Sequence, residues 1–108
     1  PPIYFERKSL PDLYSTLSSG YSRFKKECNR TIIAKITLII IIEASLTRIS
    51  NGCDRSEREP EEIIKQLFTL YVKHSIPFVM TNNRDESSMY ITNFYIAVGK
   101  EYLRKKNK

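Results

Sequence analysis

A short charged segment, residues 4–12, carries the side chains best suited to chemistry. Its sequence is YFERKSLPD, in which Glu6 and Lys8 stand two positions apart and Asp12 follows four residues later. If the segment begins as a strand, its side chains alternate, so Glu6 and Lys8 share one face and Arg7 points to the other. A carboxylate can bind a hard divalent cation, and an ammonium can orient water or offset charge on a phosphate. The spacing therefore fits metal-assisted phosphodiester hydrolysis.

The same segment also has a purely structural interpretation. Ser9 can cap a helix that begins at about Leu10, and the acid three positions after Ser9 resembles part of a capping box. In that case the charged residues only mark a solvated strand end. Spacing alone leaves both interpretations open.

The composition is that of one ordinary globular domain. The 108 residues are 41% hydrophobic and 28% charged, which suffices for a single modest core. The net charge of +6 suits a polyanionic partner such as nucleic acid. Part of this excess lies in a basic tail over residues 103–108, which is expected to be solvated.

The cysteines and the histidine argue against two other kinds of site. Cys28 and Cys53 have no metal-ligand spacing, and His74 is the only histidine. We therefore expect two free thiols and neither a structural zinc site nor a Cys/His nucleophile pair. The sequence has no signal peptide, and its longest apolar run, residues 36–42, is too short to cross a bilayer. An intracellular protein with no membrane partner is expected.

Hydrophobic periodicity predicts alternating strands and helices. The predicted strands are residues 3–7, 36–44 and 76–81, and the predicted helices are 10–17, 21–34, 60–74 and about 85–105. In the second helix Phe24, Cys28 and Ile32 would point inward, and residues 45–60 are predicted to be an exposed, mobile loop. This order of elements predicts an α/β domain with a mostly parallel central sheet and helices on both faces.

Residues 36–44, ITLIIIIEA, give the clearest strand prediction. The almost unbroken β-branched run implies burial on both faces and neighbours on both edges, as in the centre of a parallel sheet. Three strands are few for such a domain. We therefore expect a missing N-terminal strand, either upstream of Pro1 or supplied by a partner chain.

Beyond these patterns, the chain resembles the XPF-type structure-specific endonucleases, a branch of the restriction-endonuclease-like nucleases. Glu6-Arg7-Lys8-x-x-x-Asp12 matches their ERKxxxD signature, and residues 9–20 resemble their first helix and its small-residue turn. Arg23-Phe24-x-x-Glu27 is similar to the second helix, and Ile42-Glu43 resembles the acidic end of a family strand. The resemblance implies a three-layer nuclease domain over residues 1–108, truncated at its N-terminus.

The resemblance also implies an activity. Such nucleases use Mg²⁺ or Mn²⁺ to cut DNA at branches, flaps and other junctions between double and single strands. Glu6, Asp12 and the backbone carbonyl of Arg7 would hold the metal, and Lys8 would position water or stabilise the phosphorane. The catalytic residues would be Glu6, Lys8 and Asp12, and the DNA-binding residues would be Arg7, Arg23, Lys25, Lys26 and Arg30.

One feature of that family has no counterpart in this sequence. The family carries a further metal-binding aspartate, in a Gly-Asp pair on the preceding strand, and only five residues precede Glu6 here. We therefore expect little or no cleavage by this chain alone, and cleavage by its parent protein. The alternative is a catalytically incomplete DNA-binding or dimerisation module of the same fold. A basic domain with no nucleic-acid role is a more remote alternative.

The biological setting and the oligomeric state are less constrained. An apolar face of the last helix, with Met89, Tyr90 and Ile96, would support a homodimer. A bacterial or phage protein would act in the cytoplasm, and a eukaryotic one in the nucleus. The sequence fits repair, recombination and phage replication equally.

Overall fold

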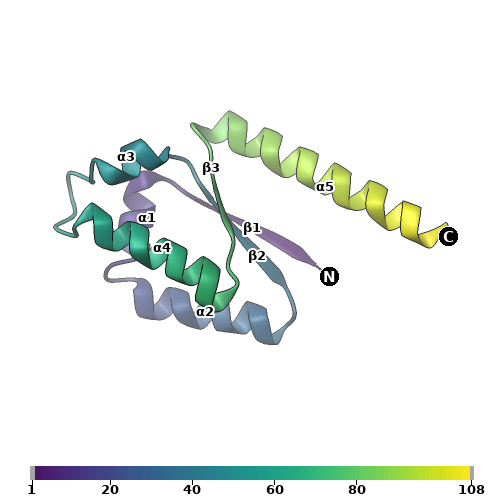
Figure 1. The fold of residues 1–108 in the computed structure, drawn as a ribbon, viewed down its shortest axis with the longest axis horizontal. Coiled ribbons are helices and arrows are strands. Elements are labelled where there is room, and N and C mark those ends of the chain that lie inside the picture. The colour runs from purple at the N-terminus through teal and green to yellow at the C-terminus, as the bar shows by residue number, and fades with distance from the viewer. Residues whose placement is uncertain (1, 108) are drawn as a thin grey trace.

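Three parallel strands lie at the centre of the structure, a computed structural model that describes residues 2–107 (Figure 1). The elements in chain order are β1 (Ile3–Lys8), α1 (Leu10–Thr16), α2 (Tyr21–Ile33), β2 (Thr37–Ile42), α3 (Leu46–Ser50), α4 (Pro60–His74), β3 (Phe78–Met80) and α5 (Arg84–Lys106). The strand order is β1-β2-β3. The prediction of an α/β domain with a mostly parallel sheet is confirmed. Lys108, the end of the predicted basic tail, lies outside the described residues, as does Pro1.

The central strand β2 is buried on both faces. Residues 38–42 are all apolar, and none is more than 6% exposed. Strand β1 pairs with one edge of β2 and strand β3 with the other, both in parallel. The predicted neighbours on both edges are therefore confirmed, and burial on both faces explains the continuous β-branched sequence.

One face of the sheet is covered by α1, α2 and α4 (Figure 1). Ile40 and Ile42 of β2 pack there in a single core cluster with Leu13 of α1, Phe24 of α2 and Leu67 of α4. Each of these five side chains is at most 3% exposed. This layer is the main hydrophobic core of the described chain.

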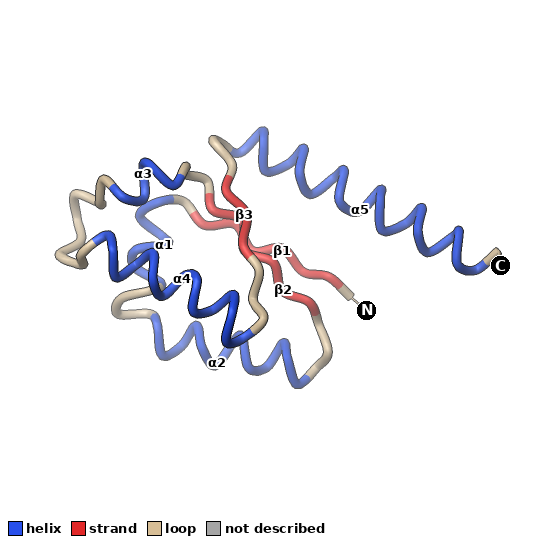
Figure 2. Tube along the Cα trace, viewed as in Figure 1, coloured by secondary structure: helices blue, strands red, loops and turns tan. Residues whose placement is uncertain are grey.

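The opposite face of the sheet is covered by α5. Phe5 of β1 meets Phe94 and Tyr95 edge-to-face, with ring centroids 5.2 and 5.4 Å apart. The carboxyl half of α5 extends beyond the sheet (Figure 2), where Val98 is 39% and Tyr102 62% exposed. Within residues 2–107, none of the helices combines the length and apolarity needed to cross a membrane.

The segment between β2 and α4 contains a short helix that the sequence pattern did not predict. The Ser45 side chain accepts a hydrogen bond from the Arg48 backbone N–H at 3.1 Å and so starts α3. Ile49 is fully buried, and the Tyr14 hydroxyl donates to its carbonyl at 2.6 Å. The prediction of an exposed, mobile loop over residues 45–60 is wrong for this part.

The inward face of α2 is shorter than predicted. Phe24 and Cys28 are buried, as expected, but Ile32 is 47% exposed. A side chain eight residues further along an α-helix points about 80° away from the direction of the first side chain. Ile32 therefore turns away from the sheet that Phe24 contacts.

Candidate active site beside the first strand

The register of β1 decides which of its charged side chains meet. Glu6 pairs laterally with Ile40 and Lys8 with Ile42, so both face the layer of α1 and α2. Lys8 Nζ lies 3.5 Å from Glu6 Oε1. The Lys8 side chain is only 18% exposed, and its Nζ also stands 5.9 Å from the Phe24 ring centroid. The predicted shared face of the acid and the amine is thus present.

Glu6 and Lys8 open into a hollow of about 230 Å³, called here the Glu6 hollow. The rest of its lining comes from the end of α1 and the first turns of α2: Ser15, Thr16, Gly20, Arg23, Phe24 and Glu27. A carboxylate, an ammonium and a guanidinium therefore face one small space. These groups can hold a cation and a phosphodiester together.

Gly20 allows the two helices that line the Glu6 hollow to approach each other. A Cβ at this position would lie 3.3 Å from both the Ser15 carbonyl oxygen and the Thr16 Cα. The Gly20 carbonyl accepts the first hydrogen bond of α2, from Phe24 N–H at 2.9 Å. A larger residue at this position would require the end of α1 to shift by a few tenths of an ångström.

Glu27 is a site residue that the predicted set of ligands did not include. It is half-buried and shares with Glu6 both the Glu6 hollow and an adjoining hollow lined by Arg30 and Thr31. The sequence signal was its position four residues after Arg23, on the same helix face. Burial, followed by the charges of Glu6 and Glu27, raises the pKa of the Cys28 thiol to about 11.

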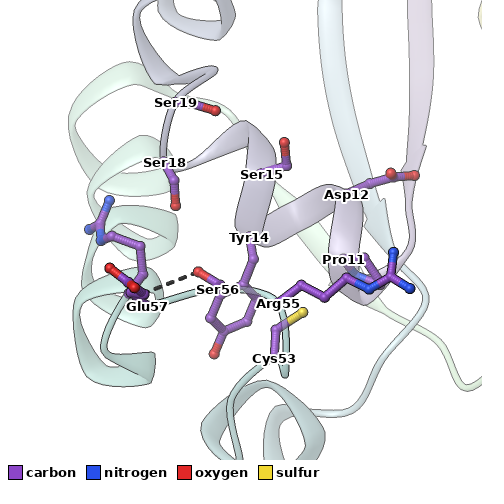
Figure 3. Close-up of a pocket in the computed structure, with 11 residues that line it drawn as sticks. Pro11, Asp12, Tyr14, Ser15, Ser18, Ser19, Cys53, Arg55, Ser56 and Glu57 are labelled. Atoms are coloured by element: carbon purple, nitrogen blue, oxygen red, sulfur yellow. Dashed lines mark hydrogen bonds between the residues drawn. The ribbon is translucent and has the colours of Figure 1, made fainter.

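Asp12 lies on a neighbouring hollow. Its backbone N–H donates to Ser9 Oγ at 3.3 Å, so the predicted Ser9 helix cap is confirmed. Its exposed side chain lines a larger cavity of about 790 Å³ between α1 and the loop before α4, called here the Arg55 hollow (Figure 3). The two hollows share Ser15. The structure thus brings Glu6, Lys8 and Arg23 together and leaves Asp12 on the adjoining wall.

The side chain of Arg7 lies on the other face of the sheet. Its Nε is 3.3 Å from Glu43 Oε2 at the end of β2, and the Glu43 backbone N–H donates to the Lys8 carbonyl at 2.8 Å. These contacts fix the carboxyl end of β1 against β2. The guanidinium itself is directed away from the Glu6 hollow.

The remaining basic residues of α2 line its exposed surface. Arg30 reaches the hollow that adjoins Glu6 and Glu27, whereas Lys25 stands with Nζ 5.4 Å from the Tyr21 ring centroid. Lys26 is exposed. Among the basic residues predicted to bind DNA on α2, only Arg23 lines the Glu6 hollow itself.

The oxygen donors near Glu6 determine which metal ions this part of the structure can bind. Across residues 2–107, no three side chains of His, Cys, Asp or Glu lie close enough together to hold an ion. Glu6 and Glu27 offer carboxylate oxygens at one hollow. Mg²⁺ is commonly held by one or two carboxylates and keeps several waters, so this donor set fits that ion.

Comparison with family models matches residues 1–94 to the ERCC4 domain. The match covers all three strands, both hollows and every predicted site residue. It ends within α5 at Phe94, one of the aromatic residues that pack on Phe5. No curated protein sequence matches the chain.

Proposed function

Because this chain belongs to the ERCC4 domain family, we propose that it is the nuclease domain of a metal-dependent DNA endonuclease. The family supports a nuclease that acts on structured DNA. The proposed reaction is hydrolysis of a phosphodiester bond in branched or flap-like DNA, at a junction between double and single strands. The observation that carries the proposal is the grouping of Glu6, Lys8 and Arg23 around one hollow.

The proposed cofactor is Mg²⁺ or Mn²⁺, held by Glu6, Asp12 and the backbone carbonyl of Arg7. When bound, such an ion supplies Lewis-acid stabilisation of the phosphate and lowers the pKa of a bound water. All of these donors are oxygens, which suits a hard cation. Glu27 shares the Glu6 hollow with Glu6, whereas Asp12 would have to approach the ion from the adjoining Arg55 hollow.

Lys8 and Arg23 act on the nucleophile and on the phosphate. The Lys8 ammonium orients the attacking water and offsets negative charge that develops on the phosphorane. Its ion pair with Glu6 and its position over Phe24 hold it at the hollow. The planar guanidinium of Arg23 donates hydrogen bonds to a non-bridging phosphate oxygen.

The remaining basic residues bind the DNA backbone. Lys25, Lys26 and Arg30 extend the positive charge of Arg23 along α2, and phosphate contacts dominate DNA affinity. Arg7 contributes indirectly, because its pair with Glu43 fixes the strand that carries Glu6 and Lys8.

A DNA-binding or dimerisation module of the same fold is the second candidate function. One observation favours it: the part of the chain that the structure describes lacks a three-ligand acidic cluster. In that case α2 would hold DNA while cleavage fell to another chain. The intact Glu6–Lys8 pair favours the endonuclease.

A homodimer formed through α5 is part of the same proposal. The helix exposes apolar side chains along its length, from Met89 at 63% to Leu103 at 58%. Pairing two nuclease-type domains would cover them. The DNA substrate places the protein inside the cell, in the cytoplasm of a bacterium or phage host or in a eukaryotic nucleus.

The proposed function is tested by cleavage of a labelled splayed-arm duplex with Mg²⁺, Mn²⁺ or EDTA. The assay uses the 108-residue chain and any longer natural form that contains it. We expect weak cleavage by the chain alone, and EDTA should abolish it. In the active form, Glu6→Gln and Lys8→Ala should each lower the rate at least about a hundredfold.

Matched controls are available on α4, where Glu61 and Lys65 are exposed. Glu61→Gln and Lys65→Ala change the same charges and should leave cleavage unchanged. Cleavage that survives Glu6→Gln and Lys8→Ala at the wild-type rate would refute the site. DNA binding without cutting, in every form tested, would favour the module.

A further inference from the structure

Strand β1 carries a third side chain on the face that holds Glu6 and Lys8. Tyr4 precedes Glu6 by two residues, so alternation directs its ring to the same side of the sheet. Both residues line a hollow of about 280 Å³ that adjoins the Glu6 hollow and is called here the Tyr4 hollow. The rest of its lining comes from β2 and the second half of α2: Glu27, Arg30, Thr31 and Leu38. A nucleotide chain that leaves the Glu6 hollow toward the start of β1 therefore enters the Tyr4 hollow.

The Tyr4 ring has a free face, unlike the other exposed aromatic rings. Tyr4 is 64% exposed, and none of the ring pairs or cation–ring contacts within residues 2–107 includes it. The remaining exposed aromatic side chains of the described chain each have such a contact: Phe68 and Tyr71 with Phe78, Tyr95 with Phe5, and Tyr102 with Lys106. An aromatic face beside the candidate active site is thus open to a ring from outside the chain.

The charges around the Tyr4 hollow favour a base over a phosphate. Glu6 and Glu27 place carboxylates there, and these repel a phosphate group. A base is uncharged, and its amino groups can donate hydrogen bonds to a carboxylate. The exposed Arg30 guanidinium belongs to none of the ion pairs among the described residues, so its planar face is also available for stacking. Aromatic rings, guanidinium planes and hydrogen-bonding side chains are the groups with which proteins hold an unstacked base.

The position of Tyr4 relates such a base to the phosphate at the Glu6 hollow. Two residues of a β-strand span about 6.6 Å, so the Tyr4 backbone lies that far along β1 from Glu6. The two hollows share Glu6 and Glu27 in their linings. A base in one and a phosphate in the other therefore belong to the same nucleotide or to adjacent ones. In a duplex the stacked neighbours cover both faces of a base, so only an unpaired base can present a face to Tyr4.

We propose that the Tyr4 hollow receives an unpaired DNA base next to the phosphate at the Glu6 hollow, with the base stacked on the Tyr4 ring. The inference rests on the proposed function and deepens it. It identifies the part of a branched or flap-like substrate that a continuous duplex does not offer. Tyr4 selects the substrate, and Glu6 and Lys8 act on it.

The test compares binding of two fluorescent DNAs to the 108-residue chain in EDTA, by anisotropy: a splayed-arm duplex and a fully paired duplex of equal length. The wild-type chain should bind the splayed-arm DNA more tightly. Tyr4→Ala should raise Kd for the splayed-arm DNA about tenfold, because base–aromatic stacking is lost, and should change Kd for the paired duplex less than about twofold. Tyr4→Phe keeps the ring and should stay within about twofold of the wild type for both DNAs.

The matched control is Tyr102→Ala, on the projecting half of α5. Tyr102 is 62% exposed, close to the 64% of Tyr4, so both changes remove the same ring from a similar surface. Tyr102→Ala should change Kd for either DNA less than about twofold, because no base stacks there. Both variants should unfold at the same urea concentration as the wild type, since each ring is mostly exposed.

Abasic nucleotides test the contact between the base and the ring. A single abasic nucleotide is placed at successive positions of the unpaired arm, which removes a base and leaves every phosphate in place. At one of these positions the wild-type Kd should rise about tenfold, and Tyr4→Ala should cause no further loss there. Additive losses from Tyr4→Ala and from the abasic nucleotide at every position would mean that no base contacts the ring, and would overturn the inference.

The remaining outcomes separate the inference from the proposed function. Equal effects of Tyr4→Ala and Tyr102→Ala on splayed-arm binding would overturn the inference, as would an equal loss of both DNAs in Tyr4→Ala. If Arg23→Ala weakens binding of both DNAs and Tyr4→Ala weakens neither, the base site is refuted while the proposed function stands. If the wild-type chain binds neither DNA, both are refuted.

Discussion

The two faces of the sheet are covered in different ways. Helices α1, α2 and α4 bury most of one face, with Leu67 and Leu70 of α4 each 1% exposed, whereas Tyr4 at its edge is 64% exposed. Helix α5 covers the other with an aromatic contact at Phe5 and then extends beyond it (Figure 2). The Glu6 hollow lies on the deeply packed side. The candidate chemistry is therefore carried by the layer in which close packing holds side chains in place.

A cavity in the packed layer should have the largest effect on stability. Leu67→Ala should lower the free energy of unfolding by about 3 kcal/mol, because Leu67 is 1% exposed and its neighbours cannot collapse fully. Urea denaturation followed by circular dichroism measures the loss. A loss below about 1 kcal/mol would mean that this face is not well packed.

A second test uses the pH dependence of stability. The pKa of Cys28 is about 11 in the folded chain, against an ordinary value of 9.0, chiefly because the thiol is buried. The unfolded thiol therefore ionises first, and stability is complete below pH 9 and declines as pH rises toward 11. The loss should reach about 2 kcal/mol.

The control for the pH test is Cys28→Ala, which removes the titrating group. Its stability should fall less steeply over the same range. Burial, with a smaller effect from Cys53, also raises the pKa of Tyr14, so a residual decline of the same sign should remain. An identical pH profile for Cys28→Ala and the wild type would contradict the assignment.

The smallest effect is expected on the projecting half of α5. Val98 is 39% exposed, so Val98→Ser in dilute protein should change the free energy of unfolding by less than about 0.5 kcal/mol. At high concentration the change should grow if α5 joins two copies, because association stabilises the folded state. A loss similar to that of Leu67→Ala in dilute protein would place this half of α5 in a packed core.

The sequence predicted most of the fold because its signals were local. The apolar run of β2 and the helical spacing in α4 each report burial directly. Helix α3 was missed because five residues carry little local signal. It depends on contacts distant in sequence, such as the bond from Tyr14 to Ile49.

The candidate site was predictable only in part. Alternation along β1 placed Glu6 and Lys8 together, since that rule needs no tertiary information. Whether Asp12 lies near them depends on the direction in which α1 leaves the strand, which spacing does not report. Asp12 lines the adjoining Arg55 hollow. Glu27 reaches the Glu6 hollow through the packing of α2 on the sheet, which residue spacing does not report.

Strand β1 has a consequence beyond the residues it carries. Among residues 2–107 it pairs only with β2, so its outer backbone groups have no strand partner, although the Tyr95 hydroxyl donates to the Ile3 carbonyl at 2.7 Å. Such an edge accepts a further strand readily. A segment added there would set every second side chain alongside Glu6.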